Sequence, residues 1–237
     1  MYKFLRKSDI YKSYSDQTYS RLGWSYGNVH LKTWQDLAVF DHINDLEASV
    51  IGEIGGGISR LLPALGKSNK IYNIEKFEGD GNGPVGRADQ KDVQVLDCFI
   101  GESDGVIPDG FFDCLFSVSV IEHIPTPQLR GFVEDHLRIM KPGATAFHAI
   151  DLYIESGMDV NHNEPSQLRF SEYIQLFVKN DAITLLEDPT DLELRFGSDF
   201  ATNPDQTMYV WNKSVPQLSE KRLLAQSVSL IVGFSKN

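Results

Sequence analysis

The sequence predicts an α/β fold built on a doubly wound, mostly parallel sheet of seven strands. From Ser49 onward, short apolar segments alternate with amphipathic ones, which is typical of parallel strands connected by helices on both faces. The first five apolar segments are almost uniformly hydrophobic, as expected of strands buried on two faces. A glycine cluster follows the first of them, where such sheets bind their ligands.

The expected elements follow one another closely along the chain. The predicted strands are Val50–Ile54, Ile71–Glu75, Val93–Asp97, Asp113–Ser119, Thr145–Asp151, Ile183–Glu187 and Ser227–Ser235. The predicted helices are Ser59–Leu65, Thr126–Met140, Ser171–Asn180 and Gln217–Gln226. Apolar residues recur every three or four positions in the second helix, and Pro142-Gly143 ends that pattern. Pro63 is expected to be tolerated, because the first turn of a helix has N–H groups without intrahelical partners.

Composition limits the classes of protein to consider. Of 237 residues, 41% are hydrophobic and 23% charged, as in ordinary globular proteins. The 22 basic and 33 acidic residues give a net charge of −11, which disfavours nucleic acid as a partner. We find neither a signal peptide nor an apolar run long enough for a membrane span, and expect a cytoplasmic protein. Cys98 and Cys114 fall in predicted core segments, which indicates free thiols in a reducing compartment.

The N-terminal residues 1–48 precede the alternating pattern. Six tyrosine and tryptophan side chains lie between Tyr11 and Trp34. Such a segment is expected either to pack on the core or to close over a ligand as a lid. We therefore divide the chain into a cap of residues 1–48 and a binding domain of residues 49–237, with an acceptor-recognition insertion at about residues 151–168.

The glycine cluster lies in the segment VIGEIGGGISRLLPALG, which begins at Val50. Glycines at a strand-to-helix turn let the backbone bend sharply and approach a ligand closely. The dinucleotide fingerprint G-x-G-x-x-G would need a glycine where Arg60 stands. Glu53, two residues before the first glycine, is an unfavourable neighbour for a pyrophosphate and suits a cationic ligand better. A nicotinamide site is therefore disfavoured, while a purely structural turn remains an alternative.

The residues from Glu53 to Ser59 resemble the first motif of the class I S-adenosylmethionine-dependent methyltransferases, in particular their type 11/12-like small-molecule branch. That motif reads acidic-x-Gly-x-Gly-x-Gly, and Ser59 stands here in place of its last glycine. The resemblance implies a Rossmann-like sheet with an antiparallel C-terminal strand, which matches the segment SVSLIVGFSK. It also implies S-adenosylmethionine as cofactor, S-adenosylhomocysteine as product, and cofactor contacts at Glu53, Gly55 and Gly57.

Further motifs occur in the order that the family shows. IYNIEKF ends the second strand at Glu75, whose carboxylate is expected to accept hydrogen bonds from both ribose hydroxyls. VQVLDCFIG ends the third strand at Asp97 and Cys98, where the family binds adenine. FFDCLFSVSVIEHIP and LRIMKPGATAFHAIDL resemble the motifs around the fourth and fifth strands. Ser119, at the end of the fourth strand, is also expected to contact the cofactor.

Three residues are candidates for the catalytic groups. A hydroxyl acceptor benefits from a general base, for which histidine is the natural side chain. His123 follows the fourth strand, where the family often places a histidine near the cofactor or acceptor. Asp151 ends the fifth strand and is expected to orient a base or bind an acceptor hydroxyl. His162 lies in the polar insertion, where the family recognises its acceptors.

The other histidines, including His30 and His42, are expected to be structural or at the surface. A divalent ion bound by Asp159, His162 and Glu164 is an alternative, but we expect no metal. His148 is expected to be a core histidine with a hydrogen-bond partner, and His136 to be structural or at the surface.

The expected function is methylation of a small polar molecule, on an oxygen of a sugar-like or otherwise hydroxylated metabolite. An N-methyltransferase acting on a small amine and a non-catalytic binding protein with the same fold are the alternatives. The expected partner is a small-molecule acceptor, with neither nucleic acid nor a membrane involved. We expect a monomer or a homodimer.

Overall fold

A mixed sheet with helices on both faces forms the body of the protein. The structure, a computed structural model, describes residues 1–15, 20, 22–23, 31–79, 83–87, 90–154, 165–202 and 226–237. Its strands are β1 (Tyr2–Phe4), β2 (Val50–Ile54), β3 (Lys70–Ile74), β4 (Val93–Leu96), β5 (Phe112–Val118), β6 (Met140–Ile154), β7 (Ile183–Leu185) and β8 (Gln226–Lys236). Its helical elements are α1 (Lys7–Ser15), α3 (Leu31–Ile43), η2 (Leu62–Ala64), η4 (Ile121–His123), α4 (Thr126–Ile139), α5 (Ser166–Tyr173) and the π-helical η5 (Ile174–Val178).

The strand order identifies the edge at which a ligand is expected. The strands run in the order β1-β8-β6-β5-β2-β3-β4, and β7 also pairs with β8. Strands β2 to β6 are parallel, whereas β8 is antiparallel to β6. The order reverses between β2 and β5, because the chain proceeds from β2 outward to β4 and then resumes at β5 on the other side of β2. Ligands of such sheets bind beyond the carboxyl ends of the strands at this reversal.

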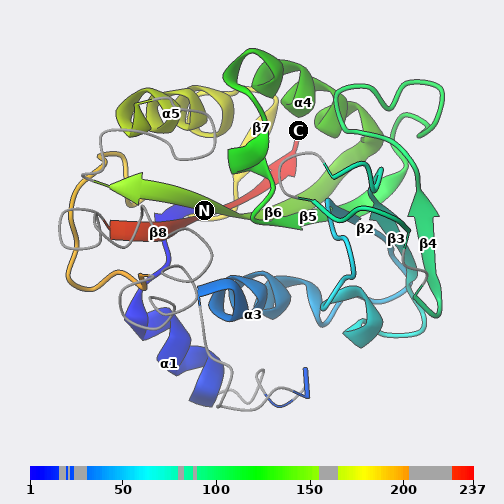
Figure 1. The fold of residues 1–237 in the computed structure, drawn as a ribbon, viewed down its shortest axis with the longest axis horizontal. Coiled ribbons are helices and arrows are strands. Elements are labelled where there is room, and N and C mark those ends of the chain that lie inside the picture. Colours follow the sequence, from blue (N-terminus) through cyan, green and yellow to red (C-terminus); the bar gives the residue numbers. More distant parts are fainter. Residues whose placement is uncertain are drawn as a thin grey trace.

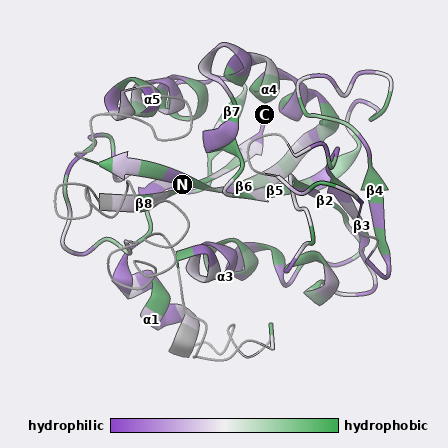
Figure 2. Ribbon diagram, viewed as in Figure 1, coloured by the Kyte–Doolittle hydropathy of each residue, from purple (hydrophilic) through white to green (hydrophobic). Residues whose placement is uncertain are grey.

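Two layers of helices cover the sheet, as the doubly wound prediction requires. In Figure 1, α4 and α5 lie on one face of the sheet and α1 and α3 on the other. The inner strands therefore bury residues on both faces: Leu115 of β5 packs beneath α4 and α5, whereas Cys114 and Phe116 pack beneath α3. Helices α4 and α5 carry both hydrophilic and hydrophobic residues, as expected of helices with one buried face (Figure 2). Among the described residues, no helix has the length and hydropathy needed to span a membrane.

The predicted helix Ser59–Leu65 is wrong. The structure has only the 3-10 turn η2 (Leu62–Ala64) in this segment. Pro63 has no N–H group, and its ring would clash with the carbonyl of Ser59 in an α-helix. The Ser59 hydroxyl instead accepts hydrogen bonds from the N–H groups of Leu61 at 3.2 Å and Leu62 at 2.9 Å, which stabilises a short capped turn.

Other predicted boundaries also need correction. The helix expected at Ser171–Asn180 begins earlier, at Ser166, directly after Pro165, whose fixed φ angle suits a helix start. Strand β6 begins at Met140 and includes Pro142-Gly143, because its pairing with β5 continues through an irregularity there. The predicted helix at Gln217–Gln226 lies outside the described residues, apart from the last residue, which begins β8.

The N-terminal segment contributes to the sheet itself. Strand β1 (Tyr2–Phe4) pairs antiparallel with β8, so the sheet of the described residues has eight strands and not seven. Three residues are too few to show the alternation by which a strand is recognised in a sequence. Trp34 of α3 is only 6% exposed and packs in the core beneath that helix. The division at residue 48 and the lid role of residues 1–48 remain predictions.

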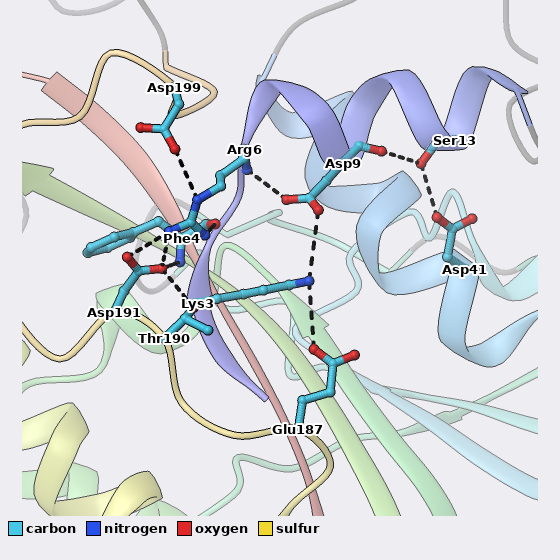
Figure 3. A network of polar contacts seen from close by, with 10 residues as sticks. All are labelled: Lys3, Phe4, Arg6, Asp9, Ser13, Asp41, Glu187, Thr190, Asp191 and Asp199. Carbon is cyan, nitrogen blue, oxygen red and sulfur yellow. Dashed lines mark hydrogen bonds and ion pairs between the residues drawn. The ribbon is translucent and has the colours of Figure 1, made fainter.

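A buried carboxylate holds β1 in place. The side chain of Asp191 is 1% exposed and accepts hydrogen bonds from the Phe4 N–H at 2.9 Å and from Arg6 Nη2 at 2.8 Å. Figure 3 shows Arg6 between Asp191 and Asp199, whose exposed carboxylate accepts a bond from Arg6 Nε at 3.0 Å. Asp191 therefore adds a buried polar contact to the pairing of this strand with β8.

Replacement of Asp191 by alanine is expected to lower the free energy of unfolding by about 2 kcal/mol, because a buried N–H group and a guanidinium lose their acceptor. Asp199→Ala is the matched control, with an expected loss of about 0.5 kcal/mol, since its side chain is 56% exposed. Urea unfolding of both variants measures the difference. Equal losses would show that β1 does not depend on the buried carboxylate.

Candidate functional site

The turn after β2 has a conformation for which glycine is required. The φ angles of Gly55 and Gly57 are +64° and +55°, where residues with a Cβ atom are strained. A Cβ atom at Gly55 would lie 2.7 Å from Val120 Cγ2, and one at Gly56 would lie 2.7 Å from Asn73 Oδ1. The turn therefore packs directly against β3 and the segment after β5, with Gly55 and Gly56 half-buried and Gly57 buried beside Pro84.

Glu53 supports this turn from its buried side. Glu53 is 6% exposed, and its carboxylate accepts a short hydrogen bond from the Ser59 hydroxyl. A Cβ atom at Gly56 would lie 3.0 Å from Glu53 Oε2. Burial raises the pKa of Glu53 to about 7. A positive charge bound at the turn would favour the ionised form, so this site is suited to a cation.

Glu75 lies against the same turn from the end of β3. Its Oε2 accepts a hydrogen bond from the Gly57 N–H at 3.3 Å, and its Oε1 accepts one from the Phe77 N–H at 3.1 Å. The residue is half-buried. Each carboxylate oxygen has a second acceptor position, so Glu75 retains capacity for hydroxyl groups of a ligand.

Arg60, which breaks the dinucleotide fingerprint, has a structural partner. Its Nε and Nη2 atoms donate to the two carboxylate oxygens of Asp36, with an Nη2 to Oδ1 distance of 2.7 Å. Asp36 belongs to α3, and its side chain is 2% exposed. A bidentate pair of this kind is directional as well as strong, so it fixes α3 against the glycine turn.

The two residues expected at adenine differ in exposure. Asp97 is exposed, whereas Cys98 is 6% exposed and carries a free thiol. Burial raises the pKa of Cys98 to about 11, so its thiol is neutral near neutral pH. Both residues follow β4, which pairs with β3, and therefore lie at the strand end next to Glu75.

A polar cluster connects four elements at the end of β5. Asp151, which was predicted to end its strand, lies within β6, because the pairing of β6 with β8 continues to Ile154. Ser119 has a φ angle of +53°, and its hydroxyl donates to Gln35 Oε1 at 2.9 Å. Gln35 Nε2 donates in turn to Asp151 Oδ1 at 2.5 Å and to Ser229 Oγ at 2.7 Å. Strained backbone at a strand end is common in functional sites. This cluster is the second part of the candidate site.

Glu122 lies beside that cluster. It is 1% exposed, and neither carboxylate oxygen has a hydrogen-bond partner among the described residues. Its Oε1 is 3.9 Å from Nε2 of His123, whose side chain is 24% exposed. Burial raises the pKa of Glu122 well above its ordinary value, and the charge of Asp151 adds to this effect. Burial also raises the pKa of Asp151, although Lys32 and Gln35 oppose that shift.

Arg169 of α5 holds the turn that carries Glu122. It is fully buried, and its guanidinium donates to the carbonyl oxygen of Ile121 at 2.9 Å and to that of Ile124. The same guanidinium donates to Thr126 Oγ1 at 2.8 Å and to the Tyr173 hydroxyl at 2.9 Å. The position of α5 therefore determines the geometry of η4.

The two buried histidines are core residues, as expected of His148. The His148 Nδ1 atom is 2.8 Å from the Ser117 hydroxyl, and the rings of His136 and His148 are 5.0 Å apart. Burial lowers the pKa of both, for His136 to about 3. Both imidazoles are therefore neutral and belong to the hydrophobic core, away from the candidate site.

The predicted site residues fall into two described groups. One group surrounds the glycine turn and comprises Glu53, Gly55, Gly57 and Glu75, with Asp97 and Cys98 at the neighbouring strand end. The other comprises Ser119 and Asp151, with His123 beside Glu122. His162 and the alternative metal ligands Asp159 and Glu164 lie outside the described residues. No group of three potential metal ligands occurs in the described part of the chain.

Sequence reasoning missed the contribution of α3. Lys32, Gln35 and Asp36 all face the candidate site, and Lys32 Nζ donates to the Val118 carbonyl at 2.7 Å. The sequence did contain an indication of this: Lys32, Gln35 and Asp36 are three and four positions apart, so they share one face of a mostly apolar helix. It was overlooked because the segment was treated only as part of a cap.

A separate cavity of about 450 Å³ lies on the other side of α3. Its walls include Lys3, Asp9, Trp34 and His42. None of the predicted site residues lines this cavity. The candidate site is therefore defined by the strand ends and not by this space.

Replacement of Glu53 by glutamine is expected to change the pH dependence of stability. A carboxyl group with a raised pKa stabilises the fold below its unfolded pKa, and this contribution is lost as the pH rises through the folded value. Between about pH 4.5 and pH 7 the wild type is therefore expected to lose about 3 kcal/mol relative to Glu53→Gln. Urea unfolding at several pH values tests this, with the exposed Glu78→Gln as control. Parallel pH profiles would contradict the assigned pKa.

No known family model matches the chain, and no curated protein matches it in sequence. Solved structures do match. A geranyl diphosphate C-methyltransferase from Streptomyces coelicolor A3(2), in complex with Mg²⁺, geranyl diphosphate and S-adenosylhomocysteine, has a TM-score of 0.56 at 12% identity, over 87% of this chain and 80% of that one. Phosphoethanolamine N-methyltransferase 2 from Haemonchus contortus has a TM-score of 0.53 at 12% identity, over 94% of this chain and 58% of that one.

These matches establish the fold. The chain has the Rossmann-like fold of the class I S-adenosylmethionine-dependent methyltransferases, with the antiparallel C-terminal strand β8 beside the parallel strand β6. The predicted fold class is confirmed. At identities this low the likeness concerns the fold alone, and the function must be argued from the site.

Proposed function

We propose that this protein transfers a methyl group from S-adenosylmethionine to a small polar acceptor. The observation that carries the proposal is the glycine turn Gly55–Gly57, held between the carboxylates of Glu53 and Glu75 where the strand order reverses. A pyrophosphate at the turn would place negative charge beside Glu53. S-adenosylmethionine instead carries a sulfonium and an ammonium, and no competing phosphate.

The residues of the structure fit this cofactor. Side chains at Gly55 and Gly56 would clash with Val120 and Asn73, so this close-packed turn requires glycine, and its backbone N–H and C=O groups would be the atoms available to a ligand. Glu75 would accept the ribose hydroxyls with its remaining lone pairs. Asp97 and Cys98, at the next strand end, would hold the adenine.

The second group of residues would receive the acceptor. When bound, the cofactor supplies an electrophilic methyl group on its sulfonium. The chain itself must position the acceptor and take up its proton, whether the acceptor atom is a hydroxyl oxygen or an amine nitrogen. Ser119, Asp151 and His123 are the described residues proposed for this, and His162 of the insertion is proposed with them.

Calorimetric titration with S-adenosylmethionine, S-adenosylhomocysteine and NAD tests the proposal. We expect the first two to bind with dissociation constants on the order of micromolar and NAD to bind far more weakly. Binding of NAD in preference to both would support an oxidoreductase. Absence of binding by all three to a folded sample would leave the glycine turn with a structural role only.

A further inference from the structure

Buried carboxyl groups outnumber the cations around them beside the ends of β2 and β5. Glu122 and Asp151 lie close enough for each charge to affect the other, and Glu53 is buried beneath the glycine turn. Lys32 is the cation that acts on all three of them in the described part of the chain. Its ammonium already donates to the Val118 carbonyl at 2.7 Å. Arg60 also acts on Glu53. Glu122 and Asp151 are therefore the pair that share Lys32 alone among the described residues, and burial with too little positive charge raises the pKa of both.

The two carboxyl groups at β5 and β6 differ in their partners. Asp151 accepts a hydrogen bond from Gln35 at 2.5 Å and lies 3.4 Å from the Ser119 hydroxyl. Glu122 is 1% exposed, and no side chain of the described residues donates a hydrogen bond to its oxygens; the backbone N–H groups of Glu122 and Asp151 are near enough only to lower its pKa slightly against the effect of burial. A buried carboxyl group without a donor is unfavourable, so such a group indicates a position for a ligand.

Partly exposed residues surround Glu122. Asp151, Ser119 and Lys32 are each half-buried, whereas Glu122 and Gln35 are almost fully buried. A small group entering past Asp151 would therefore reach the unpartnered oxygens of Glu122. The charged or titratable groups that face Glu122 are Asp151 from β6, Lys32 from α3 and its neighbour His123.

We propose that Glu122 and Asp151 form a subsite for an alkylammonium group of the methyl acceptor. An ammonium has three N–H donors and one positive charge, which match the two free oxygens of Glu122 and the unbalanced carboxyl pair. A hydroxyl would supply one donor and leave the charge excess in place. This inference rests on the proposed function and narrows the acceptor from hydroxyl or amine to amine. Glu122 or Asp151 would first take one proton from the ammonium, which gives the nitrogen the lone pair that accepts the methyl group.

The test uses ethylammonium as the probe and ethanol, its neutral isostere, as the reference. Both are titrated near neutral pH into the full chain saturated with S-adenosylhomocysteine, by ligand-observed NMR at constant sodium concentration. We expect ethylammonium to bind about tenfold more tightly than ethanol, because its contacts with the carboxyl groups are charge-assisted. Glu122→Gln should remove this preference, whereas Glu134→Gln, at an exposed position on α4, should not change it.

Equal binding of the two probes would overturn the subsite, as would an unchanged preference in Glu122→Gln. Failure of ethylammonium to bind would overturn it as well. If Glu122→Gln does not fold, Asp151→Asn is used in its place, and we expect it to weaken ethylammonium binding.

The affinity for S-adenosylhomocysteine, measured in the same samples, separates the two proposals. If S-adenosylhomocysteine binds and ethylammonium does not, only the subsite fails. If S-adenosylhomocysteine does not bind, the proposed function fails, and the probes are compared on the chain alone by the same criteria.

Discussion

Replacement of Glu75 by alanine is expected to lower the affinity for S-adenosylhomocysteine by about 100-fold or more. Two charge-assisted hydrogen bonds to ribose hydroxyls would be lost, each contributing roughly 1.5–3 kcal/mol. The substitution also removes the acceptor of the Gly57 and Phe77 N–H groups, so the turn would lose its support from β3. Calorimetric titration of the wild type and the variant measures the effect directly.

Glu78→Ala provides the matched control for this experiment. Glu78 lies three residues further along, and its side chain is 54% exposed. We expect its removal to change the affinity by less than about twofold. An affinity in Glu75→Ala within tenfold of the wild type would contradict the assignment of this carboxylate to the ribose. Thermal unfolding of both variants would show whether a loss of binding reflects a loss of folded protein.

Replacement of Arg169 by alanine is expected to lower the free energy of unfolding by about 4 kcal/mol. The change leaves buried carbonyl oxygens, including those of Ile121 and Ile124, without their donor. It also leaves a cavity between α5 and η4, where Tyr173 and Thr126 contact the guanidinium. Urea unfolding of the variant and the wild type gives the difference in free energy.

Two further variants make this prediction specific. Arg169→Lys is expected to lose almost as much stability, because an ammonium cannot reach acceptors spread around a planar guanidinium. Arg130→Ala, at an exposed position of α4, is expected to change the stability by less than about 0.5 kcal/mol. A loss below about 1 kcal/mol in Arg169→Ala would show that η4 does not depend on this residue.

The elements with strong periodicity were predictable, and those without it were not. Helix α4 ends one residue before its predicted end. Its apolar residues recur at helical spacing up to the start of the next strand, so the pattern defines both ends of the helix. Strand β2 has the predicted bounds for the same reason. The helix predicted at Ser59–Leu65 was wrong, because Pro63 falls after the first turn, where its missing N–H group and its ring interrupt an α-helix.

The candidate site was predictable only in part. Gly55, Gly57 and Glu75 were identified because they occupy fixed positions in motifs at the ends of two successive predicted strands. Glu122 was recognised only as part of a motif, since a sequence does not show whether a carboxylate finds a partner once it is buried. Whether the glycine and carboxylate positions bind the cofactor stays a prediction.

Local patterns were sufficient to establish the α/β class, the parallel core of the sheet and the position of the glycine turn, because periodicity and motif order act over a few residues. Packing alone decided which distant segments meet. Gln35 and Asp151 are 116 positions apart and share a hydrogen bond, and Arg60 pairs with Asp36 of a helix that precedes the parallel strands. These contacts depend on how α3 lies across the edge of the sheet. The free energy of that arrangement comes from many packing contacts in the two hydrophobic clusters, one on each face of the sheet, so no single position in the sequence reveals it.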